Sequence, residues 1–198
     1  MQVVNAPDPR LKIQTKPVKK IGPTLLNILT DMIKLTQTFQ DPEGVGLAAT
    51  QVGQNQSYFV GRLQLCKPVC SRLHDDKKMP KPGSKRWEGY SKDFSAIINP
   101  KILSYSKTTK SYFEGCLSIP TIWGKVKRHT GIKVSYQDTE GKQITKTLKG
   151  IPAWIFQHEV DHLRGILFTE RVLQQKGKFY KYTGRDATGA DTFEEIII

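Results

Sequence analysis

The sequence predicts an α+β protein in which antiparallel β-sheets pack around a central helix and a second helix lies against the outside. Three observations support this class. An apolar stripe at helical spacing covers residues 24–40, strand-like runs separated by short turns follow residue 94, and helical periodicity returns over residues 151–164. The 198 residues are enough for one domain with its own core and too few for two independent domains. We therefore expect a single domain over residues 1–198.

Residues 24–40 are predicted to form the outer helix. Apolar side chains recur there at i, i+4, i+7 and i+8, which places on one face Leu25, Leu29, Met32 and Ile33. Pro42 ends this helix. The polar residues 2–22 before it are expected to be irregular or extended. After it, a glycine-rich apolar segment at 44–54 leads to a strand-like run at 57–63.

The second half of the chain is predicted to alternate strands and turns before the central helix. The strand-like runs lie at residues 94–103, 106–120, 131–138 and 142–148. Their short spacing favours antiparallel pairing. Pro152 fits the first helical position and Gly165 the stop of the helix at 151–164. The glycine-containing tail is a poor helix, and its end at 193–198 is more typical of a strand.

Residues 64–95 differ in composition from their surroundings. Prolines, glycines and clustered charges occur there without a sustained period, so we expect a basic surface loop inserted in a hairpin. The formal net charge of the whole chain is +13, and this region carries a clear share of it. Such a charge attracts polyanions, RNA included, although a basic surface that only aids solubility is the simpler interpretation.

The strongest chemical signal is the H-E-x-x-H pattern of the central helix. His158 and His162 are four residues apart, about 40° around a helix with ~3.6 residues per turn, so both imidazoles point the same way. Two such rings can bind one metal ion, and Glu159 lies close enough to accept a proton from a water on that ion. The alternative is a pair of surface histidines, which is disfavoured because two of only four histidines have this spacing.

Two histidines leave a catalytic metal site one protein ligand short. Cys116 is the natural candidate for the third ligand, although a single cysteine in this context is more often a small buried core residue. The chain has three cysteines, an odd number that does not suggest a disulfide framework. A thiolate that must stay reduced to bind a metal fits a reducing compartment.

Three segments resemble the three signature motifs of the peptide deformylase family. They are GVGLAATQ at residues 44–51, EGCLS at 114–118 and QHEVDH at 157–162, and they occur complete and in the family's order. The N-terminal segment, from Pro7 to Val18, is also similar to that of the family. The resemblance covers roughly residues 1–170 apart from the basic loop, and three ordered matches are far more specific than H-E-x-x-H alone.

The resemblance implies a metal-dependent hydrolase that removes the N-formyl group from the N-terminal methionine of nascent polypeptides and releases formate. Cys116, His158 and His162 would bind one divalent ion per chain, and Glu159 would be the general acid and base. In the family the ion is commonly Fe²⁺, with Zn²⁺, Ni²⁺ or Co²⁺ also able to bind. The ligand set alone does not select among these metals.

The resemblance also implies the residues that contact the substrate. The side-chain amide of Gln51 and the backbone N–H of Leu117 would stabilise the oxyanion. The substrate-binding residues would be Gly44, Val45, Gly46, Tyr112, Glu114, Trp154 and Ile155. Arg128 matches a family arginine and is expected to orient Glu114.

The expected partner is a peptide that begins with N-formylmethionine, and a ribosome contact through the basic surface is a further hypothesis. The long charged C-terminal helix of the best-known bacterial form has no match in the tail, which disfavours docking through such a helix. We expect no membrane contact and a monomer. The location expected is the bacterial cytoplasm, or an organelle if a presequence was removed.

Three alternatives remain at this stage. A metalloprotease of the H-E-x-x-H type usually takes its third ligand downstream of the helix, but His162 is the last histidine. An RNA-binding module without catalysis would be expected to lack a ligand or Glu159. Cys66, Cys70 and His74 could hold a second metal ion, but they supply one ligand too few, so ordinary loop residues are the favoured interpretation.

Overall fold

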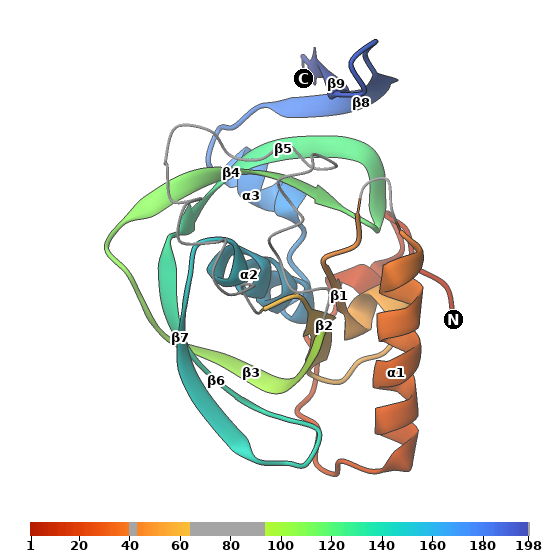
Figure 1. Cartoon of the computed structure of the whole chain (residues 1–198), viewed down its shortest axis with the longest axis vertical. Helices are drawn as coiled ribbons and strands as arrows, with labels where there is room; N and C mark the ends of the chain where they lie inside the picture. The colour runs from red at the N-terminus through yellow and green to blue at the C-terminus, as the bar shows by residue number, and fades with distance from the viewer. Residues whose placement is uncertain (40–42, 64–93, 198) are drawn as a thin grey trace.

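Two antiparallel sheets form the frame of the protein in the computed structural model, which describes residues 1–39, 43–63 and 94–197 (Figure 1). The five-stranded sheet has the order β1 (Gly46–Ala48), β2 (Tyr58–Gly61), β3 (Ser95–Tyr105), β6 (Gly131–Gln137) and β7 (Gln143–Lys149). The four-stranded sheet has the order β4 (Thr109–Cys116), β5 (Ile119–His129), β8 (Phe179–Arg185) and β9 (Asp191–Ile196). The predicted α+β class with antiparallel sheets is confirmed.

Helix α2 (Ile151–Leu163) lies between the two sheets (Figure 1). Every residue of this helix except His158 is buried, as expected for a helix that is covered on all sides. Pro152 lies in the first turn, where its missing N–H costs no hydrogen bond. The chain then turns at Gly165, whose φ of 72° is left-handed. The helix therefore ends one residue before the predicted boundary of 164.

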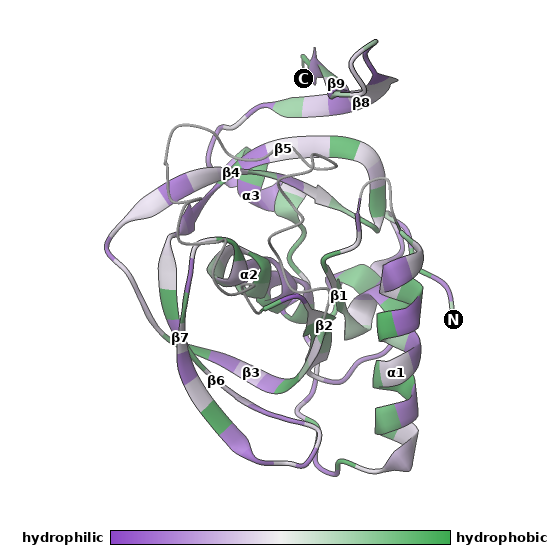
Figure 2. Ribbon diagram, viewed as in Figure 1, coloured by the Kyte–Doolittle hydropathy of each residue, from purple (hydrophilic) through white to green (hydrophobic). Residues whose placement is uncertain are grey.

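Helix α1 (Pro23–Thr38) runs along the outside, next to β1 and β2 (Figure 1). Hydrophobic residues alternate with polar ones along it, as an amphipathic surface helix requires (Figure 2). The residues that it buries are Leu25, Leu29, Met32 and Thr36, whereas Ile33 is only partly buried. The helix ends at Thr38, two residues before the predicted end at 40.

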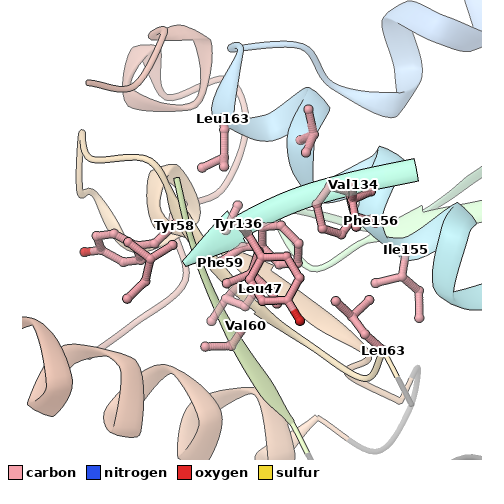
Figure 3. Close-up of a cluster of buried hydrophobic side chains, with 14 of the residues drawn as sticks. Leu47, Tyr58, Phe59, Val60, Leu63, Val134, Tyr136, Ile155, Phe156 and Leu163 are labelled. Atoms are coloured by element: carbon pink, nitrogen blue, oxygen red, sulfur yellow. The ribbon is translucent and has the colours of Figure 1, made fainter. Parts of the chain in front are cut away.

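The main hydrophobic core fixes α2 on the five-stranded sheet, and Figure 3 shows part of it. Phe59 of β2 and Phe156 of α2 are fully buried, and their rings meet edge to face with centroids 5.2 Å apart. Leu47 and Val134 belong to the same cluster. Burial of each such side chain stabilises the fold by roughly 1.5–3 kcal/mol. This packing gives the side chains of α2 fixed positions relative to β1.

Two elements differ from the predictions. Residues 119–129 form the long strand β5, of which only the first two residues fell within a predicted run. Its exposed lysines, Lys125 and Lys127, interrupt the apolar pattern because they lie on its outer face. Helix α3 (Phe168–Gln174) was not predicted. Its seven residues are too few for a clear helical period, and the burial of Phe168 and Val172 fixes it in place.

The predicted basic loop at 64–95 falls almost wholly outside the described residues, as do Cys66, Cys70 and His74. The strands on either side of it do pair, because Gly61 of β2 lies opposite Ser95 of β3. Within the described ranges, no helix is both long and apolar enough to cross a membrane.

Candidate metal centre and catalytic cleft

Strand β4 and helix α2 bring three candidate metal ligands together. Cys116 ends β4, and His158 and His162 lie one turn apart on α2. Their ligand atoms all lie within 4.8 Å of one another, and Cys116 Sγ is 3.2 Å from His162 Nε2. In a tetrahedral site, metal–sulfur and metal–nitrogen bonds of ~2.3 and ~2.1 Å place S and N about 3.5 Å apart. The thiolate and the two imidazoles therefore fit one divalent ion.

A buried carboxylate holds the first histidine in place. His158 Nδ1 is 2.9 Å from Glu114 Oε2, so its other ring nitrogen, Nε2, is the one left for a metal ion. Glu114 is completely buried and also accepts hydrogen bonds from Trp154 Nε1 at 2.8 Å and from two nitrogens of Arg128 at 2.7 and 2.9 Å. Burial alone would raise the pKa of Glu114, but Arg128 and His158 outweigh it and lower the pKa to about 2. Glu114 is therefore a permanent carboxylate.

The same arginine connects this carboxylate to a second acid. Arg128 Nη1 also bonds Asp161 Oδ2, and Arg171 of α3 donates to both oxygens of Asp161 at 2.6 and 3.0 Å. Burial opposes ionisation of Asp161, but the two guanidinium groups outweigh it and lower its pKa. The network ties α2 to β4, β5 and α3. Arg171 was not among the predicted site residues. The only sequence feature that pointed to such a partner was Asp161, an acidic residue inside the H-E-x-x-H pattern next to His162.

Glu159 lies in the cleft beside the candidate ligands. Its carboxylate is buried, and Oε2 has no hydrogen-bond partner among the described residues. Burial, the main cause, raises its pKa to about 7. Gly46 leaves the space that this carboxylate occupies, because a Cβ at residue 46 would lie only 2.3 Å from Glu159 Oε1. The group is thus suited to gain and lose a proton near neutral pH.

The amide of Gln51 points at the same cluster. Gln51 lies in a short 3₁₀ helix at Ala49–Val52, and its Oε1 accepts a hydrogen bond from Ala48 N at 2.8 Å. This contact directs Nε2 toward Cys116 Sγ at 3.3 Å and Ser118 Oγ at 3.2 Å. Leu117, the other predicted oxyanion donor, lines the pocket next to Cys116.

A narrow cavity of about 70 Å³ opens onto these residues. Predicted substrate-binding residues that line it are Gly44, Val45, Gly46, Trp154 and Ile155. Tyr112 and Glu114 were predicted to line it too, but the structure places them behind the wall. Tyr112 stacks on Trp154 with ring centroids 5.4 Å apart, and Glu114 bonds its indole N–H. Lining residues that were not predicted are Glu43, Gly115 and Trp123.

The fold and the site define a class: α+β proteins in which a strand cysteine and two histidines of one helix could hold a metal ion beside a carboxylate. Comparison with known proteins gives the family. The sequence profile of polypeptide deformylase matches residues 1–178. The chain belongs to the polypeptide deformylase family, as the three motifs predicted.

Individual relatives agree with this assignment. The peptide deformylase of Novosphingobium aromaticivorans is 35% identical over 178 residues, which cover 88% of this chain and 90% of the relative. The crystal structure of peptide deformylase from Thermotoga maritima has a TM-score of 0.68 and 34% identity, and the match covers 86% of this chain and 95% of that one. A class I type b peptide deformylase from Acinetobacter baumannii, solved with Met-Ala-Ser bound, has a TM-score of 0.69 and 30% identity over 86% of this chain and 97% of its own.

Proposed function

We propose that this chain is a peptide deformylase, a hydrolase that removes the N-formyl group from the N-terminal methionine of nascent polypeptides and releases formate. The observation that carries the proposal is the buried carboxylate of Glu159, whose Oε2 has no hydrogen-bond partner among the described residues, beside the Cys116, His158 and His162 cluster at a narrow pocket. Helix α2, with its H-E-x-x-H pattern, would then be the central catalytic helix. Family membership supports the same activity.

Cys116, His158 and His162 would hold one divalent ion, Fe²⁺ in the cell, with Zn²⁺, Ni²⁺ or Co²⁺ as substitutes. When bound, the ion would polarise the formyl carbonyl and lower the pKa of a water molecule, so that hydroxide is available near neutral pH. The carboxylate of Glu114 would keep the ring of His158 oriented, and Arg128 would in turn orient Glu114. The thiolate and imidazoles suit several of these metals, so the choice follows availability as much as affinity.

Glu159 would carry the proton through the reaction. It accepts a proton from the attacking water and later donates it to the amine nitrogen of methionine as the C–N bond to the formyl carbon breaks. A carboxylate whose pKa lies near 7 is suited to both directions of transfer at neutral pH. The space left by Gly46 positions this carboxylate on the cleft side of α2.

Charge on the formyl oxygen would be stabilised by two donors, the Gln51 amide and the backbone N–H of Leu117. Gln51 Nε2 already lies 3.3 Å from Cys116 Sγ, so only a small movement would bring it to an oxygen placed at the ligand cluster. In comparable acyl-transfer sites, each such donor contributes about 3 kcal/mol to the stability of the transition state.

The substrate would enter the cleft as an extended peptide. The backbone of residues 44–46 would pair with it, and Val45, Trp154 and Ile155 would contact the methionine side chain. Tyr112 and Glu114 would support this pocket from behind through Trp154.

We further propose that residues 1–198 act as a single catalytic domain and that the basic insertion at 64–95 contacts ribosomal RNA through phosphates. The expected state is a monomer in the bacterial cytoplasm or in an organelle. Ribosome binding that does not weaken between low and moderate salt, or that survives removal of the insertion, would argue against the RNA contact.

The decisive experiment measures formate release from formyl-Met-Ala-Ser by anaerobically prepared, iron-loaded protein. Glu159→Ala should reduce kcat by about 10²–10⁴-fold without loss of bound metal. Glu140→Ala, which removes an exposed carboxylate in the turn after β6, serves as the matched control. Equal rates for Glu159→Ala and the unchanged protein would rule out the role of Glu159. Cleavage of internal peptide bonds without formate release would instead support a metalloprotease.

A further inference from the structure

A second cavity, of about 270 Å³, adjoins the catalytic pocket. The two cavities share Cys116, Leu117 and Trp123 in their walls, so they meet where β4 turns into β5. Phe39, which follows helix α1, also lines the second cavity. Its carbonyl accepts a hydrogen bond from Gly44 N, so the second cavity also reaches the segment that lines the catalytic pocket. The second cavity therefore lies next to the site at which the substrate's first residue is expected.

The outer wall of the second cavity comes from the C-terminal hairpin of β8 and β9. This hairpin lies beyond β5 at the edge of the molecule (Figure 1). It contributes Tyr182, Asp191 and Phe193 to the cavity. The match to the polypeptide deformylase family ends at residue 178, before β8 begins, so these three residues lie outside the matched region. The catalytic pocket, in contrast, is built wholly from matched residues.

Aromatic packing holds the hairpin in place. Phe193 meets Phe113 of β4 and Trp123 of β5 with ring centroids 4.9 and 5.5 Å apart. Backbone pairing of Trp123 with Tyr180 continues the sheet from β5 to β8. Gly115 allows Trp123 to lie flat on the strand, since a Cβ there would lie 2.9 Å from the indole. The wall shared by the two cavities is therefore rigid, and it is completed by the hairpin.

The lining of the second cavity favours an apolar occupant. Its aliphatic part consists of Leu117, Ile119, Pro120 and Ile122, and its aromatic part of Phe39, Trp123, Tyr182 and Phe193. Asp191 is the one carboxylate among the described lining residues, and Arg185 pairs with it at 3.2 Å. Burial of a large apolar side chain here would be favourable, whereas a charged side chain would lose hydration in this mainly apolar lining.

We propose that the second cavity is a specificity site for the nascent peptide, where it receives a large apolar or aromatic side chain from one of the first three residues after methionine. This inference rests on the proposed deformylase function. An extended chain advances about 3.3 Å per residue, and alternate side chains point to the same side. A peptide held by its methionine would therefore present a later side chain to the adjoining cavity.

The test compares kcat/KM for formyl-Met-Ala-Ala-Ala with peptides in which leucine or phenylalanine replaces one alanine at a time. One position should show a preference of about tenfold or more over alanine. Tyr182→Ala should reduce that preference several-fold, because the ring forms part of the wall. The ring of Tyr182 packs against Phe193, but the contacts of Phe193 with Phe113 of β4 and Trp123 of β5 do not involve Tyr182, so they should survive. Lys181→Ala, an exposed neighbour, is the matched control and should retain the preference.

A charge variant separates this proposal from a loss of folding. Tyr182→Lys should change the preference at the same position toward glutamate, which partial unfolding cannot do. Thr183→Lys adds the same charge at an exposed residue and should leave the preference apolar. Hydrolysis of all peptides at equal kcat/KM, or variants at Tyr182 with unaltered preference, would overturn this inference while leaving the deformylase function intact. Absence of formate release even from formyl-Met-Ala would overturn the proposed function, and this inference with it.

Discussion

The inner and outer parts of the four-stranded sheet are stabilised in opposite ways. On the inner side, Arg128 of β5 is buried between two carboxylates, Glu114 and Asp161. On the outer side, the exposed ion pair Lys178–Glu195 links the residue before β8 to β9, and aromatic rings fix the hairpin to β5. Buried charges that lose a partner are strongly destabilising, whereas exposed pairs contribute little. The inner part therefore determines whether the site exists, and the outer part can vary without loss of the fold.

Replacement of the central arginine should give the largest effect. Arg128→Met keeps much of the side-chain volume but leaves Glu114 and Asp161 buried without their shared cation. We expect the free energy of unfolding to fall by about 3–5 kcal/mol, as measured by denaturant titration. Metal content should fall as well, because the support of His158 depends on Glu114. A decrease in the free energy of unfolding of less than about 1 kcal/mol would show that the inner network contributes no more to stability than an exposed ion pair does.

Removal of an oxyanion donor from the same inner region should affect the rate of catalysis more than the stability of the fold. Gln51→Leu retains the approximate shape of a buried side chain and removes its amide. We expect kcat to fall by about 10²–10³-fold with KM little altered, since the donor acts in the transition state. Gln54→Leu is the control, because Gln54 is only partly buried and lies in the loop after the 3₁₀ helix Ala49–Val52. A rise in KM with constant kcat would instead assign Gln51 to ground-state binding.

Gly46→Ala examines how tightly the inner region positions Glu159. The added Cβ would lie 2.3 Å from Glu159 Oε1, so the carboxylate must move. A displacement of this kind should reduce kcat by about 10²-fold, with bound metal and unfolding midpoint close to those of the unchanged protein. Gly22→Ala is the matched control, because a Cβ there meets nothing within 4 Å. Full activity of Gly46→Ala would show that the position of Glu159 is not critical.

The same contrast explains what could be predicted from the sequence. The helix at 151–164 and its ligands were predictable because His158, Glu159 and His162 are close in the chain and have a fixed helical geometry. Cys116 was reached only through chemistry and family resemblance. The role of Arg171 could not be predicted, since its contact with Asp161 depends on α3, a helix too short to show a period.

Tyr112 and Glu114 show a second limit of prediction. Both were expected at the pocket surface, yet both lie behind Trp154, because strand alternation does not reveal which face of β4 a large indole will cover. The second cavity could not be predicted from the sequence either. Phe193 falls within the strand predicted at 193–198, but no strand was predicted around Tyr182, and only the pairing of β8 with β5 brings the two residues near Cys116.

The smallest effect is expected at the exposed pair of the outer hairpin. Lys178→Ala removes the partner of Glu195, whose carboxylate lies 2.8 Å from Lys178 Nζ. Both side chains are largely solvated, so water replaces the lost contact, and the unfolding midpoint should equal that of the unchanged protein within error. Added salt should not create a difference in unfolding midpoint between Lys178→Ala and the unchanged protein, because an exposed pair is already screened. A clear loss of stability would mean that the hairpin depends on its charges and that Phe193 alone does not hold it to β5.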